Sequence, residues 1–224
     1  MRVLLTGSTG MIGKGVLLEM LENDKIEKII LLNRTQTEVK HSKIQEILLS
    51  DFTKISHIKS EIGKVDACFH CMGVSAIGLN EEKYSQLTFD ISKMLADIVY
   101  EINPSAIFNY VSGVGTDSSE NGRQMWARVK GKTENYLLNK GFSKAFMFRP
   151  GAIIPEKGIQ SKTGWYDIIY KVMRPLFPLF LKSESVTTTT RIGNAMIQTL
   201  FTGRASGILE PKDINQISKE INQD

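Results

Sequence analysis

Three glycines near the start of the chain are spaced three residues apart. They lie in the stretch Thr6-Gly7-Ser8-Thr9-Gly10-Met11-Ile12-Gly13, between a short apolar segment and an amphipathic one. A glycine-rich turn between a strand and a helix directs backbone N–H groups and the positive helix end toward a pyrophosphate. We expect Gly7 to form the tight turn, Gly10 to let phosphate approach and Gly13 to let the helix pack closely. The alternative is a set of turn or packing glycines in a domain that binds no nucleotide.

An arginine follows the second apolar segment, which ends at Leu32-Asn33-Arg34. An NAD site usually has Asp or Glu at this distance from the glycines, to bind the ribose hydroxyls. Here no carboxylate follows the segment before Glu38. The planar guanidinium of Arg34 can instead pair with a 2′-phosphate. The sequence therefore favours NADP over NAD, and the alternative is an ordinary surface arginine.

Short apolar segments alternate with longer amphipathic ones, and the strands and helices that they form must position these residues. Strands are expected at 3–5, 29–32, 44–49, 67–71, 107–111 and 145–148, and helices at 11–22, 80–102 and 124–138. Such alternation with continuous apolar strands predicts a parallel sheet covered on both faces. We expect an α/β fold, a Rossmann-type doubly wound parallel sheet with a small C-terminal cap.

The composition changes after Gly151. Three prolines and many large apolar residues interrupt the strand–helix pattern, and Thr190 is a possible cap for a helix at 191–201. We expect a single domain over residues 1–224, to which residues 152–190 contribute a cap over the substrate. The apolar stretch 165–181 is interpreted as a lid or as packing under the cap, and contact with a membrane surface is the less favoured alternative.

Length, charge and cysteine content exclude several classes of protein. The 224 residues with 42% hydrophobic content suit one large core, and the formal net charge of +4 is mild. The basic residues are scattered, whereas a nucleic-acid site needs them clustered. Two cysteines do not make a disulfide scaffold, and neither a signal peptide nor an apolar run of about 18 residues is visible. A reducing, cytoplasmic setting is therefore expected.

Further motifs follow the later strands. They are Asp51-Phe52, Cys71-Met72-Gly73, Tyr110-Val111-Ser112, Lys130-Gly131-Lys132 and Phe148-Arg149-Pro150-Gly151. Together with the Gly-x-x-Gly-x-x-Gly spacing they resemble the short-chain dehydrogenase/reductase superfamily. The resemblance is to its extended and atypical branches, which include NAD(P)-dependent epimerases, dehydratases and reductases, and most of all to the Tat-interacting protein 30 (CC3) subgroup. It covers roughly residues 1–155.

The resemblance implies a catalytic set and a cofactor site. The superfamily uses Ser, Tyr and Lys, and Ser112 and Lys130 match two of them, but Trp126 stands four residues before the lysine, where the tyrosine belongs. An indole N–H only donates a hydrogen bond and does not titrate usefully. Asp117, Tyr166 and Tyr170 are candidate replacement acids, whereas Tyr136 should face elsewhere on its helix. The residues expected to bind the dinucleotide are Gly7, Ser8, Thr9, Gly10, Met11, Ile12, Asn33, Arg34, Asp51, Phe52, Cys71, Met72, Gly73, Lys130, Pro150, Gly151 and Ile153.

The remaining cysteine and histidine positions suggest no metal site. Cys68 and Cys71 are three apart on a strand and so point to opposite faces, and further zinc ligands are missing. Cys68 and His70 are expected in the core. Two function classes therefore stay open: an NADP-dependent oxidoreductase or epimerase acting on a small molecule with a rearranged acid, and a non-catalytic NADP-binding sensor or interaction protein.

Overall fold

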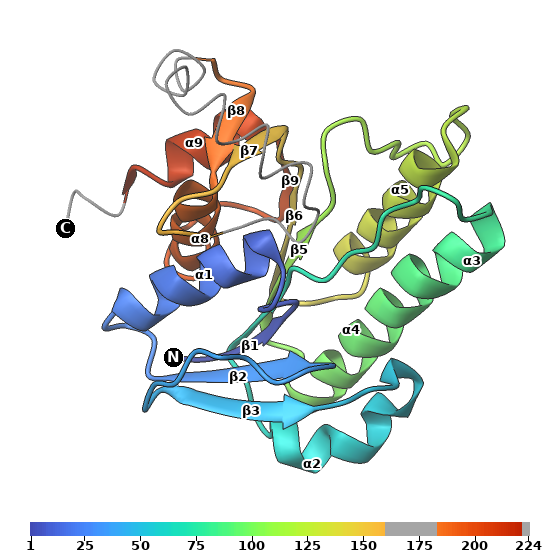
Figure 1. Cartoon of the computed structure of the whole chain (residues 1–224). Coiled ribbons are helices and arrows are strands. Elements are labelled where there is room, and N and C mark those ends of the chain that lie inside the picture. Colours follow the sequence, from blue (N-terminus) through green and yellow to red (C-terminus); the bar gives the residue numbers. More distant parts are fainter. Residues whose placement is uncertain (160–182, 221–224) are drawn as a thin grey trace.

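A seven-stranded, entirely parallel sheet forms the centre of the computed structural model, which describes residues 1–159 and 183–220 (Figure 1). Its strand order is β3-β2-β1-β4-β5-β6-β9. The strands are β1 (Arg2–Thr6), β2 (Lys28–Asn33), β3 (Ile44–Leu48), β4 (Ala67–His70), β5 (Ile107–Val111), β6 (Lys144–Phe148) and β9 (Gly207–Leu209). The predicted Rossmann-type fold is confirmed. The order reverses between β1 and β4, and ligands bind at the carboxyl ends of strands beside such a switch point.

Helices cover both faces of this sheet. The elements are α1 (Met11–Glu22), the 3₁₀ helix η1 (Phe52–Ile58), α2 (Lys59–Ile62), α3 (Glu81–Ser85), the π-helix η2 (Gln86–Asp90), α4 (Ile91–Ile102), α5 (Met125–Leu138), α8 (Thr189–Gln198) and α9 (Pro211–Ile217). Val3 and Leu5 of β1 pack with α1, α8 and α9, whereas Leu4 packs in a second core with α4 and α5. Successive strand residues point to opposite faces, so one apolar strand serves both cores.

A second, two-stranded parallel sheet pairs β7 (Ala152–Ile154) with β8 (Val186–Thr188). These strands lie within the segment expected to form the cap, residues 152–190. The central part of that segment, including the predicted lid and the membrane-surface alternative at 165–181, lies outside the described residues. The cap therefore stays a prediction.

Two helices differ from expectation. Residues 80–102, expected as one α-helix, form α3, η2 and α4 in succession, because a π-helical turn adds a residue that apolar spacing does not signal. The helix expected from residue 191 begins at Thr189. Its cap is Thr188, whose hydroxyl accepts from the Arg191 backbone N–H at 3.1 Å. Thr190 is therefore inside the helix and not its cap.

Candidate nucleotide-binding and active site

The glycine loop brings three backbone segments into direct contact. Gly7 has a φ of +76°, and a Cβ there would lie 2.7 Å from the backbone of Cys71 and Met72, just after β4. A Cβ on Gly13 would lie 2.2 Å from the Gly7 carbonyl oxygen. No side chain caps α1 at Gly10, so the N–H groups of its first turn keep their positive end for an anion.

A cavity of about 330 Å³ opens beside this loop. It is lined by Gly7, Thr9, Leu32, Asn33, Arg34, Thr35, Phe52 and Met72. The structure thus brings residues expected to bind a dinucleotide, from four separate segments, around one space. A volume of this size falls in the range of small-molecule sites.

A second cavity of about 510 Å³ shares Arg34, Phe52 and Met72 with the first. Its further walls include Asp51 and residues of η2 and α4, namely Gln86, Leu87, Asp90, Ile91 and Met94. The Asp51 carboxylate accepts from the Thr53 backbone N–H at 3.0 Å and from its hydroxyl at 2.6 Å, and these hydrogen bonds lower the Asp51 pKa. Asp51 therefore caps η1 while it lines the cavity.

Glu46 of β3 holds the end of β2, and sequence reasoning missed it. Its Oε1 accepts from Asn33 Nδ2 and from the Thr37 backbone N–H, both at 2.8 Å. The buried Ser8 hydroxyl donates to Asn33 Oδ1 at 2.8 Å. Ser8 and Asn33 are thus engaged with each other, and the neighbouring Arg34 is left exposed at the cavity.

Lys14 is a second residue that sequence reasoning missed. It lines a third cavity, of about 230 Å³, together with Ser8, Thr9 and residues 35–39. Its place directly after Gly13 was the available signal. Lys14 on α1 and Arg34 in the loop beyond β2 therefore place two cations near the glycine turn.

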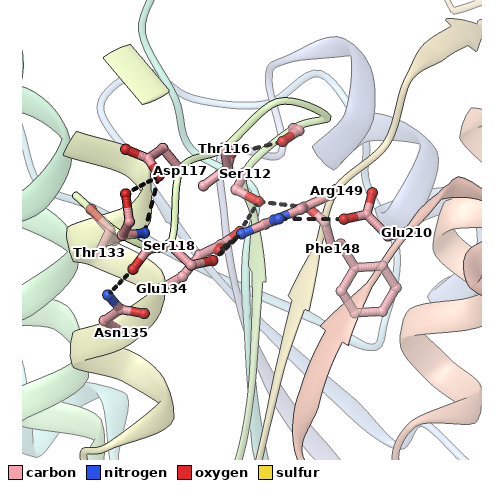
Figure 2. Close-up of polar contacts among 12 residues, drawn as sticks. Ser112, Thr116, Asp117, Ser118, Thr133, Glu134, Asn135, Phe148, Arg149 and Glu210 are labelled. Carbon is pink, nitrogen blue, oxygen red and sulfur yellow. Dashed lines mark hydrogen bonds and ion pairs between the residues drawn. The ribbon is translucent and has the colours of Figure 1, made fainter. Parts of the chain in front are cut away.

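Ser112, the predicted catalytic serine, points into the protein. Its hydroxyl lies 2.5 Å from Glu134 Oε1 and 3.1 Å from the Phe148 carbonyl oxygen, and the residue is only 6% exposed (Figure 2). A hydroxyl has a single hydrogen to donate, and here it is directed at Glu134. Glu134 lies one helical turn after Lys130 and was not expected to take part.

Arg149 completes this buried cluster. Its Nε and Nη2 donate to the two oxygens of Glu134 at 3.0 and 2.5 Å, and Nη2 also donates to the Ser118 hydroxyl at 2.6 Å. Nη1 lies 3.3 Å from the carboxylate of Glu210 (Figure 2). Hydrogen bonding to Glu134 raises the Arg149 pKa. Since Glu134 is fully buried, removing its cation would leave an unpaired charge, a change that typically costs about 3–5 kcal/mol.

Lys130 and Trp126 share one face of α5, because they are four residues apart. Lys130 Nζ donates to the Ser112 carbonyl oxygen at 2.6 Å. Burial lowers the pKa of Lys130, although the nearby Glu134 opposes that shift. The half-buried Trp126 indole lies against the loop after β5, where a Cβ on Gly115 would be 3.2 Å from its ring.

Of the candidate replacement acids, Asp117 already has other partners. The Asp117 carboxylate accepts from the Ser119 N–H and hydroxyl and from the Gly122 N–H, and these hydrogen bonds lower the Asp117 pKa. A carboxylate stabilised in this way is a poor proton donor at neutral pH. Tyr136 donates to Asp97 on α4, away from Lys130, as expected. Tyr166 and Tyr170 lie outside the described residues.

The other predicted cofactor residues lie around the same edge of the sheet. The backbone of Cys71 packs on Gly7, whereas its side chain, with a pKa raised by burial, faces Met196. The Pro150 carbonyl accepts from the Val114 N–H at 3.1 Å. Gly151 packs tightly on Ser185, and β7 with Ile153 follows it. Met11 and Ile12 open α1, and Gly73 follows Met72.

Cys68 and His70 are buried, as predicted. His70 Nε2 lies 2.9 Å from the Ser92 hydroxyl, and Nδ1 lies 2.6 Å from the Thr6 hydroxyl. Burial lowers the pKa of His70 to about 3, so the ring is neutral. Within residues 1–159 and 183–220, no cluster of three or more His, Cys, Asp or Glu could hold a metal ion, and no helix is long and apolar enough to span a bilayer.

Comparison with known proteins confirms the predicted resemblance. Residues 3–113 match the NAD dependent epimerase/dehydratase family. "Protein FMP52, mitochondrial" of Meyerozyma guilliermondii is 22% identical over 228 residues, which cover 98% of this chain and 96% of the relative. "Protein HTATIP2" of Rattus norvegicus is 24% identical over 159 residues, 69% of this chain and 64% of the relative.

Solved structures with this fold include enzymes that act on sugar nucleotides. The ADP-L-glycero-D-manno-heptose-6-epimerase of Helicobacter pylori superposes with a TM-score of 0.69 at 16% identity, covering 100% of this chain and 83% of that one. The dTDP-glucose 4,6-dehydratase DesIV of Streptomyces venezuelae, solved with NAD and TYD bound, also gives 0.69, at 14% identity, covering 100% of this chain and 82% of that one. At these identities the likeness establishes the fold alone.

The expectation of a cytoplasmic protein is contradicted. The matching FMP52 proteins of M. guilliermondii, Candida albicans and Emericella nidulans are mitochondrial. The expectation rested on the missing secretory signal peptide and the low cysteine count, and neither property distinguishes the cytoplasm from the mitochondrion.

Proposed function

We propose that this chain, which resembles the NAD dependent epimerase/dehydratase family over residues 3–113 and the Tat-interacting protein 30 group, binds NADP and acts as an oxidoreductase or epimerase on a small molecule. The observation that carries the proposal is the cavity shared by the glycine loop and Arg34. A Cβ at Gly7 or Gly13 would collide with neighbouring backbone, so the turn requires glycine at both positions, as a phosphate-binding turn does.

The residues around the two joined cavities fit NADP in type and position. The loop from Gly7 to Ile12 and the uncapped start of α1 would hold the pyrophosphate. Phe52 and Met72, which line both cavities, would contact the adenine ring. Arg34 would bind the 2′-phosphate, and Lys14 adds positive charge nearby.

The nicotinamide end would lie near Lys130, whose ammonium can bind ribose hydroxyls. When bound, the nicotinamide ring supplies or accepts a hydride. Around it, Trp126 replaces the titratable phenol of the superfamily, and the Ser112 hydroxyl is committed to Glu134. Proton transfer here must therefore use a group other than the usual tyrosine.

These departures also favour a second candidate function, a non-catalytic protein that senses NADP or binds a partner in response to it. The specific observation is that Trp126, Ser112 and Asp117 leave the described part of the site without an ordinary catalytic acid. Both candidates require NADP binding and differ in turnover alone.

Nucleotide preference tests what the two candidates share. We expect NADP to bind more tightly than NAD in calorimetric titrations. The Arg34→Ala variant should lose most of that difference, because a charge-assisted pair contributes about 1.5–3 kcal/mol, roughly a tenfold to hundredfold change in Kd. Arg123→Ala, a change at an exposed arginine outside the cavities, is the matched control and should leave both affinities unchanged. Equal affinities for NADP and NAD in the unmodified protein would refute the preference.

A further inference from the structure

Positions 112 and 113 have different surroundings in the loop that follows β5. The Ser112 side chain points inward, to Glu134 and the Phe148 carbonyl. A Cβ built on Gly113 would instead have Lys130 Nζ as its neighbour, at 3.7 Å, an ordinary van der Waals contact. The position that adjoins the lysine is therefore 113, and it has no side chain.

From this geometry we propose that position 113, and not 112, is the place in this site from which a side-chain hydroxyl would reach a substrate oxygen, and that Gly113 leaves this task to Lys130. The proposal deepens the proposed function and rests on it for the identity of the bound nucleotide. Ser112 becomes a positioning residue, because its carbonyl oxygen accepts from Lys130 Nζ while its hydroxyl is fixed by Glu134.

The cluster beneath Ser112 keeps the hydroxyl where it is. If Ser112 rotated toward Lys130, the buried Glu134 would lose a hydrogen-bond donor and retain Arg149 alone. Burying a charged group with fewer hydrogen bonds is unfavourable. An ammonium has three N–H donors, and Ser112 uses one of them. The others remain for a ribose hydroxyl and for an oxygen of the substrate beside Gly113.

Cysteine substitution tests the two directions without requiring a substrate. Gly113→Cys should react readily with iodoacetamide, because the nearby Lys130 ammonium favours the thiolate. Ser112→Cys should be nearly inert, because its thiol would be buried beside the Glu134 carboxylate, which raises a thiol pKa. The parent protein measures the background from Cys68, which is buried, and Cys71, whose pKa is raised.

NADP should protect the new thiol. At a nucleotide concentration of about 100 times Kd, the free protein falls to roughly 1%, so labelling of Gly113→Cys should slow by well over tenfold. Rapid labelling of Ser112→Cys together with an inert Gly113→Cys would overturn the proposal, as would labelling of Gly113→Cys that bound NADP leaves unchanged. If NADP does not bind the parent protein, the proposed function fails. The difference in labelling rate between Gly113→Cys and Ser112→Cys without nucleotide still shows which of the two side chains is accessible beside Lys130.

A second variant covers the case in which Gly113→Cys does not fold, since the φ of +155° at this position disfavours a side chain. Ser112→Ala removes the donor to Glu134 from the core and should lower Tm by about 3–10 °C, measured by circular dichroism. Ser112→Thr keeps the hydroxyl and should recover much of that loss. An unchanged Tm in Ser112→Ala would overturn the inward role of Ser112 and with it the proposal.

Discussion

Trp126 is the residue on which the catalytic question depends. Positioned proton transfer contributes about 10²–10⁴ in rate, and an indole cannot supply it. We expect the unmodified protein to reduce a panel of generic aldehydes and ketones with NADPH at close to the background rate. Trp126→Tyr should raise that rate at least about tenfold, because a phenol one helical turn from Lys130 can release a proton.

The control for this change is Trp126→Phe, which removes the indole without adding a hydroxyl and should stay at background. Rapid turnover by the unmodified protein would contradict the prediction and point to a different proton donor. Equal rates in the Tyr and Phe variants would show that the added hydroxyl is not the cause. A further increase on adding Gly113→Ser to Trp126→Tyr is expected from the geometry at Lys130.

His70 makes stability depend on pH. Its pKa is about 3 in the folded protein, because burial disfavours the charged ring, against about 6.5 when unfolded. Between these values the unfolded state binds a proton that the folded state does not, so stability falls as pH decreases from 6.5 toward 3. At about 1.4 kcal/mol per unit, roughly 2 kcal/mol is lost between pH 7 and pH 5.

Urea unfolding of His70→Gln measures this contribution. The variant should show a smaller loss of unfolding free energy between pH 7 and pH 5 than the unmodified protein does. His57→Gln, at an exposed histidine, is the control and should keep the original pH dependence. An unchanged pH dependence in His70→Gln would mean that His70 is not the titrating group.

Sequence patterns at the residue scale predicted which residues lie around the cavity beside the glycine loop better than they predicted what each side chain does there. Arg34 and Gly7 were chosen from short-range spacing along one strand and one turn, and both line the same cavity. Ser112 was matched to the catalytic serine because it lies at the end of a strand, but along a strand a shift of one residue reverses the direction in which a side chain points. Its partner Glu134 and the Asn33 partner Glu46 are 22 and 13 residues away, and only the folded chain brings them into contact.

Helices α1 and α8 pack closely against each other through glycines on both helices. A Cβ on Gly15 would lie 2.6 Å from the Thr189 Cβ, and one on Gly193 would lie 2.6 Å from Glu19. We expect Gly15→Ala to destabilise the protein by about 1–3 kcal/mol in urea unfolding, because it overpacks this contact.

Gly203→Ala is the matched control for this change. Gly203 is exposed, and a Cβ there meets no described atom within 4 Å. Its stability should be unchanged or slightly raised, since alanine restricts the unfolded chain. If Gly15→Ala proves as stable as Gly203→Ala, the two helices can separate without penalty, and the close contact is not important for stability.

The elements that sequence patterns predicted well are those long enough to show a period. Helix α1 was expected at residues 11–22 and has those bounds. The strand β9 has three residues, which is too short for an alternation to be recognised, and the helix α9 that follows has seven. The 3₁₀ helix η1 and helix α2 were missed for the same reason.

At the scale of the whole molecule, the predicted topology holds because the inner strands of the large sheet, β1, β2, β4, β5 and β6, are buried along almost their whole length. Their continuous apolar runs distinguish parallel sheets from half-exposed ones. The last strand, β9, joins the edge of this sheet beside β6 from more than fifty residues further along the chain. No local pattern specifies that pairing, and so no strand was expected after residues 145–148.

The short β7–β8 pair predicts that residues 160–182 can be replaced. The strands are parallel and adjacent. The connection therefore only has to run from the end of β7 back to the start of β8, which is the length of a three-residue strand. With residues 155–159 and 183–185 retained, a linker of about six glycines and serines should suffice, given the dozen or so residues that a parallel crossover needs. We expect this variant to melt as one unit and to bind NADP with little change in Kd by calorimetry. Failure to fold would show instead that the replaced residues complete the core.

The same pair of strands bears on how such a protein could change its chemistry over time. A segment that leaves and re-enters the fold at neighbouring points can be exchanged for another without disturbing the cofactor-binding framework. Under the proposed function, in which residues 152–190 contribute to the substrate site, recombination at β7 and β8 would alter which molecules are selected and would leave the glycine loop and Arg34 unchanged. A library of grafted segments at this junction is, on that view, a practical route to new substrates on an unchanged scaffold.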